Sequence, residues 1–229
     1  MNTQNELKKE AGYFAADLVA SDMVVGLGTG STAQFALERI AARIRARALK
    51  NIVGIPTSTR TENSALELGI PLGSLDDYPE IDLTIDGADE VDPQLDLIKG
   101  GGGALLREKI IAQASRRNII IVDAGKLVPH LGTNWAVPVE VIPLARETEK
   151  RFLTGLGAGV SLRMRSDDTA FITSQRNLIL DADFKAIDQP DTLAARLNQR
   201  AGIVEHGLFL GLATDVIVAE ETGIRHLKR

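Results

Sequence analysis

The segment MVVGLGTGSTAQFALERIAARIRARA, residues 23–48, decides the fold class of this 229-residue chain. It begins with a short apolar run over 23–25, passes through a glycine-rich turn over 26–32 and continues as a helix to about residue 48. A strand that leads through a loop into a helix is the first half of a β-α-β unit, whose strands are parallel and buried. The segment therefore predicts an α/β protein with a parallel sheet.

The same alternation of strand and helix continues on both sides of this segment. Apolar runs predict further strands at 52–55, 81–85 and 119–122. Helical patterns predict a helix over 6–20, one that follows the strand at 52–55 and ends at about residue 68, and one that contains Glu108. Crossover connections of this kind place helices on both faces of the sheet. We expect a Rossmann-like, mostly parallel, doubly wound sheet.

The pattern changes after about residue 131 and predicts a second, smaller α+β part. The expected order is a strand near 137–141, a helix over 144–156, strands at 160–165 and within 169–181, a helix over 191–200 and a strand over 203–209. The order β-α-β-β-α-β is that of a ferredoxin-like unit. A last strand at 216–218 can return to the first sheet. We therefore expect a Rossmann-like catalytic domain over 1–131 plus 210–229, and a smaller domain over 132–209.

Composition excludes several classes of function. The chain has no cysteine, which removes disulfides, thiolate nucleophiles and zinc–thiolate sites, and its three histidines lie far apart. The net charge is −5 and no segment is basic enough for a nucleic-acid surface. The N-terminus has no signal-peptide pattern and no apolar run is long enough to span a membrane. We expect a cytoplasmic protein with neither nucleic acid nor membrane as a partner.

The glycine-rich loop is a candidate phosphate site. Glycines let a backbone approach a ligand closely, and a helix N-terminus presents N–H groups that favour an anion. Thr29, Gly30, Ser31 and Thr32 stand at that point. A tight turn with a Ser or Thr cap explains the loop equally well. The dinucleotide fingerprint fails because Ser31 replaces its third glycine and no acid follows about 20 residues later, and no Gly-Lys-Ser/Thr P-loop is present.

Acidic side chains follow the strand at 81–85. Asp86, Asp89 and Glu90 repel one another there, so we expect them to serve a metal, substrate hydroxyls or a shared proton. A magnesium site suits carboxylates alone, and Asx-turn or capping chemistry is the structural alternative.

The third candidate segment is KGGGGALLREK, residues 99–109. Four consecutive glycines are costly to order. Their presence is explained if backbone N–H groups surround an anion there, or if the loop has to move. Glu108 falls on a largely apolar arc of the following helix, and partial desolvation there would raise its pKa and strengthen it as a base. The alternative is a surface glutamate within the charged run 107–109.

The first, second and fourth expected strands each end in a polar motif, and in a doubly wound sheet such strand ends share one crevice. A phosphate loop, an acid pair, Lys99 and Glu108 at one place suit proton transfer on a phosphorylated carbonyl compound. A Ser-His-Asp order, an HExxH motif and a thiol are all missing from the sequence, so hydrolase schemes lack their parts.

Four segments together resemble the type A ribose-5-phosphate isomerases. They are GLGTGST (26–32), DGADE (86–90), KGGGGALLREK (99–109) and GIVEHGLF (202–209), in the family's order and with similar spacing. The resemblance implies interconversion of ribose 5-phosphate and ribulose 5-phosphate through an enediolate, in the non-oxidative pentose phosphate pathway, without metal or cofactor. It also implies a homodimer or a tetramer.

The resemblance further implies a role for each matching residue. Glu108 would move the proton between C1 and C2, Asp86 and Asp89 would bind sugar hydroxyls and assist ring opening, and Lys99 would stabilise the developing negative charge. The implied substrate-binding positions are Lys8, Thr29, Gly30, Ser31, Thr32, Asp86, Gly87, Ala88, Asp89, Lys99, Gly100, Gly101, Gly102 and Lys126.

Three other functions remain open from the residues alone. A sugar-phosphate sensor would keep the phosphate loop without needing Glu108. An acyl or CoA transferase would use Glu108 as a covalent nucleophile. A magnesium-dependent phosphosugar enzyme would use Asp86, Asp89 and Glu90 as ligands.

Overall fold

The computed structural model describes residues 4–229, which divide into two compact units. The first unit is Met1–Ala88, Arg107–Lys126 and Gly211–Arg229, and the second is Asp89–Leu106 and Leu127–Leu210. The units differ from the expected domains mainly in residues 89–106, which belong to the second unit. The expected domain boundaries stay a prediction, because a compact unit need not fold independently as a domain does.

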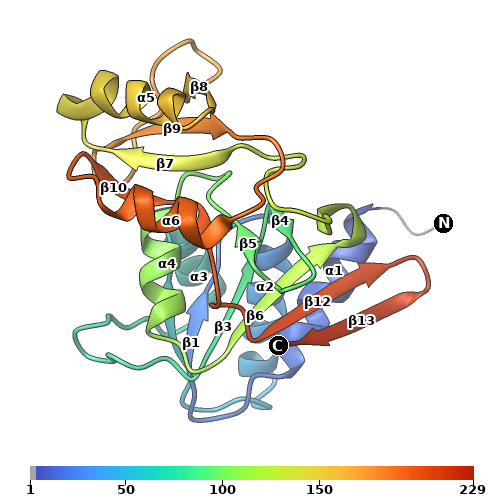
Figure 1. The fold of residues 1–229 in the computed structure, drawn as a ribbon. Coiled ribbons are helices and arrows are strands. Elements are labelled where there is room, and N and C mark those ends of the chain that lie inside the picture. Colours follow the sequence, from blue (N-terminus) through green and yellow to red (C-terminus); the bar gives the residue numbers. More distant parts are fainter. Residues whose placement is uncertain (1–3) are drawn as a thin grey trace. The chain divides into compact units, whose positions relative to one another are not determined.

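The first unit contains a six-stranded sheet in the order β13-β12-β6-β3-β1-β2 (Figure 1). Its strands are β1 (Val24–Leu27), β2 (Val53–Pro56), β3 (Leu83–Gly87), β6 (Asn118–Asp123), β12 (Asp215–Glu220) and β13 (Gly223–Lys228). All neighbours pair in parallel except β12 and β13. The predicted parallel sheet and the return of the strand at 216–218 to it are confirmed.

Helices cover this sheet on both faces. The helices are α1 (Gln4–Asp17), α2 (Ser31–Arg45), α3 (Thr59–Leu68) and α4 (Leu105–Gln113), followed by the short 3₁₀ turn η1 (Ala124–Lys126). Val25 and Leu27 of β1 join the apolar core beneath α1 and α2. Gly26 points to the opposite face, where a side chain would meet Ile111 of α4. The fold class expected from the sequence is thus confirmed.

The second unit is built on a four-stranded antiparallel sheet in the order β10-β7-β9-β8. Its elements are β7 (Val137–Val141), the 3₁₀ turn η2 (Pro143–Ala145), α5 (Arg146–Gly155), β8 (Gly159–Leu162), β9 (Leu178–Asp183), α6 (Pro190–Asn198) and β10 (Ile203–His206). Val137, Val139 and Val141 pack into one core with Leu153 of α5 and Leu197 of α6. This is the predicted β-α-β-β-α-β unit.

Three expected strands of the second unit differ in length from the prediction, and the one expected at 160–165 is β8, Gly159–Leu162. Of the alternating stretch 169–181, only the residues from 178 on belong to a regular strand, β9, which continues to 183, because a positive φ at Arg176 turns the chain before it. The strand expected at 203–209 divides at Gly207 into β10 and β11 (Leu208–Phe209).

β11 belongs to a small sheet that the sequence did not predict. It pairs antiparallel with β5 (Leu97–Ile98), which pairs with β4 (Glu90–Val91). Strands of two residues carry too little alternation to be recognised in a sequence. This sheet fixes the backbone next to two predicted site residues, because β4 begins directly after Asp89 and β5 ends directly before Lys99.

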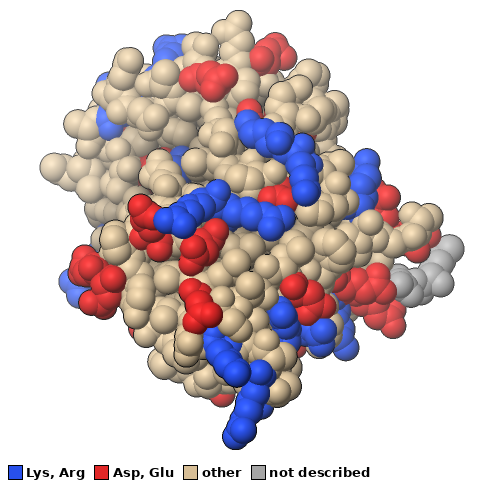
Figure 2. Space-filling view, turned by 90° about the horizontal axis from the view of Figure 1, so that it is seen from below, with Lys and Arg blue, Asp and Glu red and all other residues tan. Residues whose placement is uncertain are grey.

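Within residues 4–229, none of the helices has the length and apolar character needed to cross a membrane. On the face shown in Figure 2, Lys and Arg side chains lie among Asp and Glu side chains and form no continuous basic patch.

Candidate functional site

In the first unit, the loop after β1 packs tightly against the end of β3. The Gly28 N–H donates to the carbonyl of Ile85 at 2.9 Å. A Cβ atom at Gly28 would lie 2.4 Å from that carbonyl and 2.4 Å from Oδ1 of Asp86. Only glycine therefore lets the two strand ends approach this closely.

This packing orients the Asp86 carboxylate. Oδ1 of Asp86 accepts the Thr29 N–H at 3.0 Å and the Gly87 N–H at 2.8 Å. The residue is 2% exposed, so the two amides replace water around that oxygen. The structure thus brings together three of the predicted site residues, Thr29, Asp86 and Gly87.

A cluster of hydroxyl groups lies behind Thr29. Its Oγ1 is 2.8 Å from Thr57 Oγ1, 2.8 Å from Ser58 Oγ and 3.0 Å from Thr61 Oγ1. The Thr57 and Thr61 hydroxyls also reach the carbonyls of Leu27 and Gly28, at 3.0 Å each. These hydroxyls tie the glycine-rich loop to the end of β2. Sequence reasoning missed them, although their position directly after a predicted strand was a usable signal.

The N-terminus of α2 has the features of an anion site. Gly30 is the cap residue with φ 122°, and no side chain caps the helix. The first-turn N–H groups, which have no partner within a helix, therefore point out of its end. Nζ of Lys8, from α1, lies 3.3 Å from Oγ of Ser31. Helix N–H groups, a hydroxyl and an ammonium suit a phosphate group.

Glu108 is a buried residue in the first turn of α4, with 5% of its surface exposed. Its helical neighbours Leu105 and Ile111 are buried as well. The predicted desolvation of this carboxylate is confirmed, and the alternative of a surface glutamate in a charged run is wrong. A carboxylate shielded from water suits a general base.

In the second unit, Asp89 is held by the glycine segment that follows it. Its Oδ2 accepts the N–H of Gly101 at 2.7 Å, and its own N–H donates to the carbonyl of Ile98 at 2.8 Å. A Cβ atom at Gly101 would lie 2.7 Å from Oδ1 of Asp89. The glycine is therefore required for this close contact.

Lys99 is 4% exposed and is set by the segment around Gly207. Its backbone N–H donates to the carbonyl of Gly207 at 2.9 Å, and its Nζ lies 5.5 Å from the centre of the Phe209 ring. A cation over an aromatic face is electrostatically favourable. The segment GIVEHGLF thus contributes support for Lys99.

Glu90, in contrast, has a structural function. Its two carboxylate oxygens accept the backbone N–H groups of Gly132 and Asn134. Across residues 4–229, the structure has no group of three Asp, Glu or His side chains placed to hold a metal ion. Both carboxylate oxygens of Glu90 are therefore occupied by backbone amides of the second unit.

The remaining predicted residues lie in the expected segments. Lys126 ends the turn η1, and the nearby Asp123 carboxylate accepts the Gly125 N–H at 3.0 Å. Gly102 is exposed and Ala88 is half-buried. That predicted site residues of the first unit and of the second unit bind one ligand together stays a prediction.

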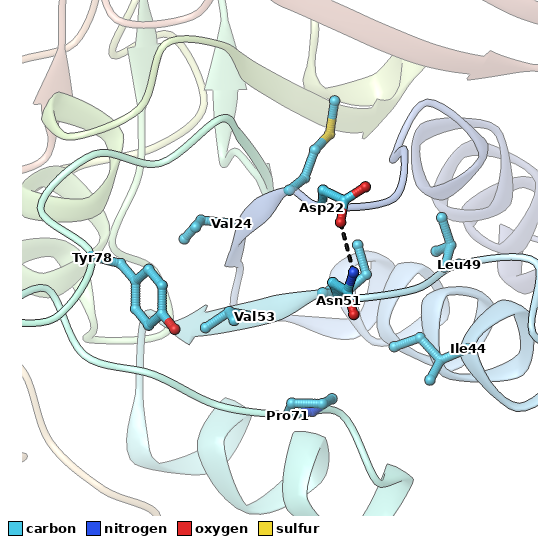
Figure 3. Close-up of a pocket in the computed structure, with 10 residues that line it drawn as sticks. Asp22, Val24, Ile44, Leu49, Asn51, Val53, Pro71 and Tyr78 are labelled. Carbon is cyan, nitrogen blue, oxygen red and sulfur yellow. Dashed lines mark hydrogen bonds between the residues drawn. The ribbon is translucent and has the colours of Figure 1, made fainter.

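A pocket of about 500 Å³ lies elsewhere in the first unit (Figure 3). It is lined by Val24 and Val53, the first residues of β1 and β2, and by Asp22, which accepts from Asn51 at 2.7 Å. It therefore lies at the opposite strand ends from the glycine-rich loop and is not part of the candidate site.

Known proteins resemble this chain over its full length. A family model described as ribose 5-phosphate isomerase A (phosphoriboisomerase A) matches residues 53–223. The ribose-5-phosphate isomerase A of Desulfatibacillum aliphaticivorans is 55% identical over 228 residues, which cover 100% of this chain and 99% of that protein. The corresponding protein of Chloroflexus aurantiacus is 54% identical, over 98% of this chain and 95% of its own.

Solved structures give the same result. A D-ribose-5-phosphate isomerase in complex with phospho-erythronic acid superposes with a TM-score of 0.97 and 41% identity, over 100% of both chains. The ribose 5-phosphate isomerase from Plasmodium falciparum has a TM-score of 0.96 and 39% identity, over 99% of both chains.

Proposed function

We propose that Glu108 is the catalytic base of this chain, which belongs to the ribose 5-phosphate isomerase A family and interconverts ribose 5-phosphate and ribulose 5-phosphate. The observation that carries the assignment of the base is the burial of this carboxylate on α4. The similar structure that holds phospho-erythronic acid supports a phosphorylated sugar acid or sugar as the kind of ligand.

The phosphate group of the substrate binds at the N-terminus of α2. There the N–H groups of the first helical turn, the Ser31 hydroxyl and the Lys8 ammonium offer hydrogen bonds and positive charge. Thr29, Gly30 and Thr32 shape this loop, and Lys126 adds a further cation. Binding a non-reacting group at a distance from the reacting carbons holds those carbons in position.

The proton moves between C2 and C1 of the open-chain sugar. Glu108 removes the proton from C2 of the aldose, and the electron pair of that C–H bond forms the C1–C2 double bond of an enediolate. Glu108 then returns the proton to C1 while the hydroxyl proton on the C2 oxygen passes to the C1 oxygen, which gives the ketose without an oxidant or reductant. Lys99 stabilises the negative charge on the enediolate oxygen, and backbone N–H groups of the segment 100–102 other than that of Gly101, which holds Asp89, assist it.

Asp86 and Asp89 bind sugar hydroxyls and assist opening of the ring. Each has one carboxylate oxygen held by backbone N–H groups, Asp86 by Thr29 and Gly87, and Asp89 by Gly101. A carboxylate whose rotation is restricted loses little entropy when it accepts a substrate hydroxyl.

The test compares Glu108→Gln with the unmodified protein. Purified protein is incubated with ribose 5-phosphate in the presence of EDTA, and ribulose 5-phosphate is followed with time. We expect kcat to fall by about 10²–10⁴-fold, while KM changes little, because the amide keeps the shape of the side chain but cannot take a proton.

Glu38→Gln is the matched control, because it makes the same change in another helical glutamate. Glu38 lies on α2, accepts a hydrogen bond from Gln34 and has no role in the proposed reaction. Its kcat should equal that of the unmodified protein. Near-full turnover in Glu108→Gln would overturn the assignment of the base. No turnover in the unmodified protein would favour a sensor, and an acyl adduct on Glu108 would favour a transferase.

The proposal also includes a cytoplasmic location and, as the family resemblance implies, a homodimer or a tetramer. Sedimentation analysis checks the oligomeric state, since a protein that stays monomeric at micromolar concentration would refute it.

A further inference from the structure

Arg163 connects the antiparallel sheet of the second unit with the glycine segment. It follows β8 directly, and its backbone is set by β9, because its N–H donates to the carbonyl of Ile179 at 2.9 Å. Its side chain is 13% exposed. The side chain is therefore part of the interior of this unit rather than a surface charge.

The guanidinium group of Arg163 uses two of its edges. Nε donates to Oδ2 of Asp181 at 2.9 Å, and Nη2 donates to Oδ1 of the same carboxylate. Nη1 donates to the carbonyl of Gly100 at 2.8 Å and to the carbonyl of Gly101 at 3.0 Å. The ion pair with Asp181 thus aims one nitrogen at two consecutive carbonyl groups.

One of these carbonyls belongs to the peptide group that holds Asp89. The peptide between Gly100 and Gly101 accepts from Arg163 through its C=O and donates to Asp89 Oδ2 through its N–H, at 2.7 Å. In a trans peptide these two groups point in opposite directions, and the structure has no cis peptide within residues 4–229. Arg163 and Asp89 therefore hold the two ends of one peptide plane.

A glycine peptide needs such a restraint. Gly100 has φ 100° and Gly103 has φ 78°, and a glycine backbone reaches both signs of φ at little cost. Rotation of this plane would turn a carbonyl oxygen toward the Asp89 carboxylate. A cation on the C=O also polarises the peptide and strengthens its N–H as a donor.

From this geometry we infer that Arg163 is a positioning residue, which orients Asp89 and the Gly101 and Gly102 N–H groups through the glycine peptide. Because both carbonyls face Arg163, both of these N–H groups face away from it. The inference rests on the proposed function where it concerns catalysis, and on the structure alone where it concerns the orientation of the loop.

The experiment compares Arg163→Gln and Arg163→Ala with Arg200→Gln. Arg200 is the matched control, because it makes the same two-bond ion pair with Glu149 in the same unit and does not reach the glycine segment. We expect Arg163→Gln to lower kcat by about 10–100-fold with KM changed by less than about threefold, since small misplacement of site groups affects the chemical step. Arg200→Gln should lower the melting temperature by a similar amount and leave kcat within about twofold.

Chemical rescue separates positioning from a general loss of stability. Guanidinium chloride at a non-denaturing concentration should restore turnover of Arg163→Ala several-fold, and the same salt should neither restore Glu108→Gln nor change the turnover of Arg200→Gln. An Arg163→Gln variant with full kcat, or an Arg200→Gln variant with an equal loss, would overturn the inference.

A measurement without substrate keeps this inference distinct from the proposed function. In protein labelled with ¹⁵N-glycine, the amide proton of Gly101 should shift to lower frequency in Arg163→Gln, because its hydrogen bond to Asp89 weakens. An unchanged Gly101 resonance would overturn the inference even in an active enzyme. If the unmodified protein had no isomerase activity, the proposed function would fail, and the resonance would still decide what Arg163 does.

Discussion

Replacing Thr29 with valine tests how much the hydroxyl cluster stabilises the first unit. Thr29, Thr57, Ser58 and Thr61 contribute four hydroxyl hydrogens, one each. Six oxygen–oxygen distances lie within hydrogen-bonding range, four between these hydroxyls and two to the carbonyls of Leu27 and Gly28. Four hydrogens cannot make six hydrogen bonds at one time, so the bonds exchange among these pairs.

This count sets the expected loss of stability. Valine at position 29 removes one hydrogen and the three distances that involve Oγ1 of Thr29. Three hydrogens then remain for three distances, Ser58 to Thr61 and the two carbonyl contacts. The net change is one hydrogen bond, which corresponds to about 1 kcal/mol, and no donor is left without an acceptor.

Urea unfolding at pH 7 measures the change, with Thr29→Ser as the control that keeps the hydroxyl. We expect Thr29→Val to lose about 1 kcal/mol with an unchanged m-value. A loss of about 3 kcal/mol would mean that each of the three distances is a full hydrogen bond, which would refute the donor count. A loss near zero relative to Thr29→Ser would mean that the cluster does not stabilise the fold.

Two further changes test other parts of the structure. Burial raises the pKa of Asp215, but hydrogen bonds from Arg117, Thr214 and His226 outweigh it and hold that pKa well below its usual range. The carboxylate therefore stabilises the fold above its unfolded pKa of about 4, and this contribution is lost as the pH falls further. In urea unfolding, Asp215→Asn should cost about 2 kcal/mol of stability at pH 7 and progressively less toward pH 3. An equal cost at both pH values would contradict the assignment. Gly207→Ala should destabilise the protein by about 1–3 kcal/mol and lower kcat, because the added Cβ would lie 2.4 Å from the carbonyl oxygen of Lys99. The matched control is Gly155→Ala, whose Cβ has open space and which should leave the melting temperature unchanged or slightly higher.

The sequence predicted the parallel sheet well because its strands are buried on both faces. Such strands appear as short continuous apolar runs, as in 119–122, and glycine or proline marks their ends. The edge strand β13 was missed, because it reads GIRHLK and mixes charged and apolar residues. None of the residues of β13 is fully buried, so this strand lacks the apolar run that identifies the others.

The partners of the predicted site residues could not be read from the sequence. Arg163 lies 62 positions from Gly101, and no periodicity connects residues at that separation. The burial of Glu108 was predictable, because it follows from its place on one helix. Contacts between elements depend on how the chain returns to the same place, which local patterns do not encode.

Asp86 and Asp89, the two acids that the sequence predicts to bind the sugar, share a mode of support. Asp86 receives N–H groups from Thr29 and Gly87, and Asp89 receives the N–H of Gly101. In both, a backbone amide next to a glycine orients the carboxylate, and a Cβ atom at Gly28 or Gly101 would collide with it. The positions of these carboxylates are therefore set by backbone conformation. Substitutions that change the glycine backbone or its restraint by Arg163 should consequently affect catalysis more than changes to neighbouring side chains that only touch the acids.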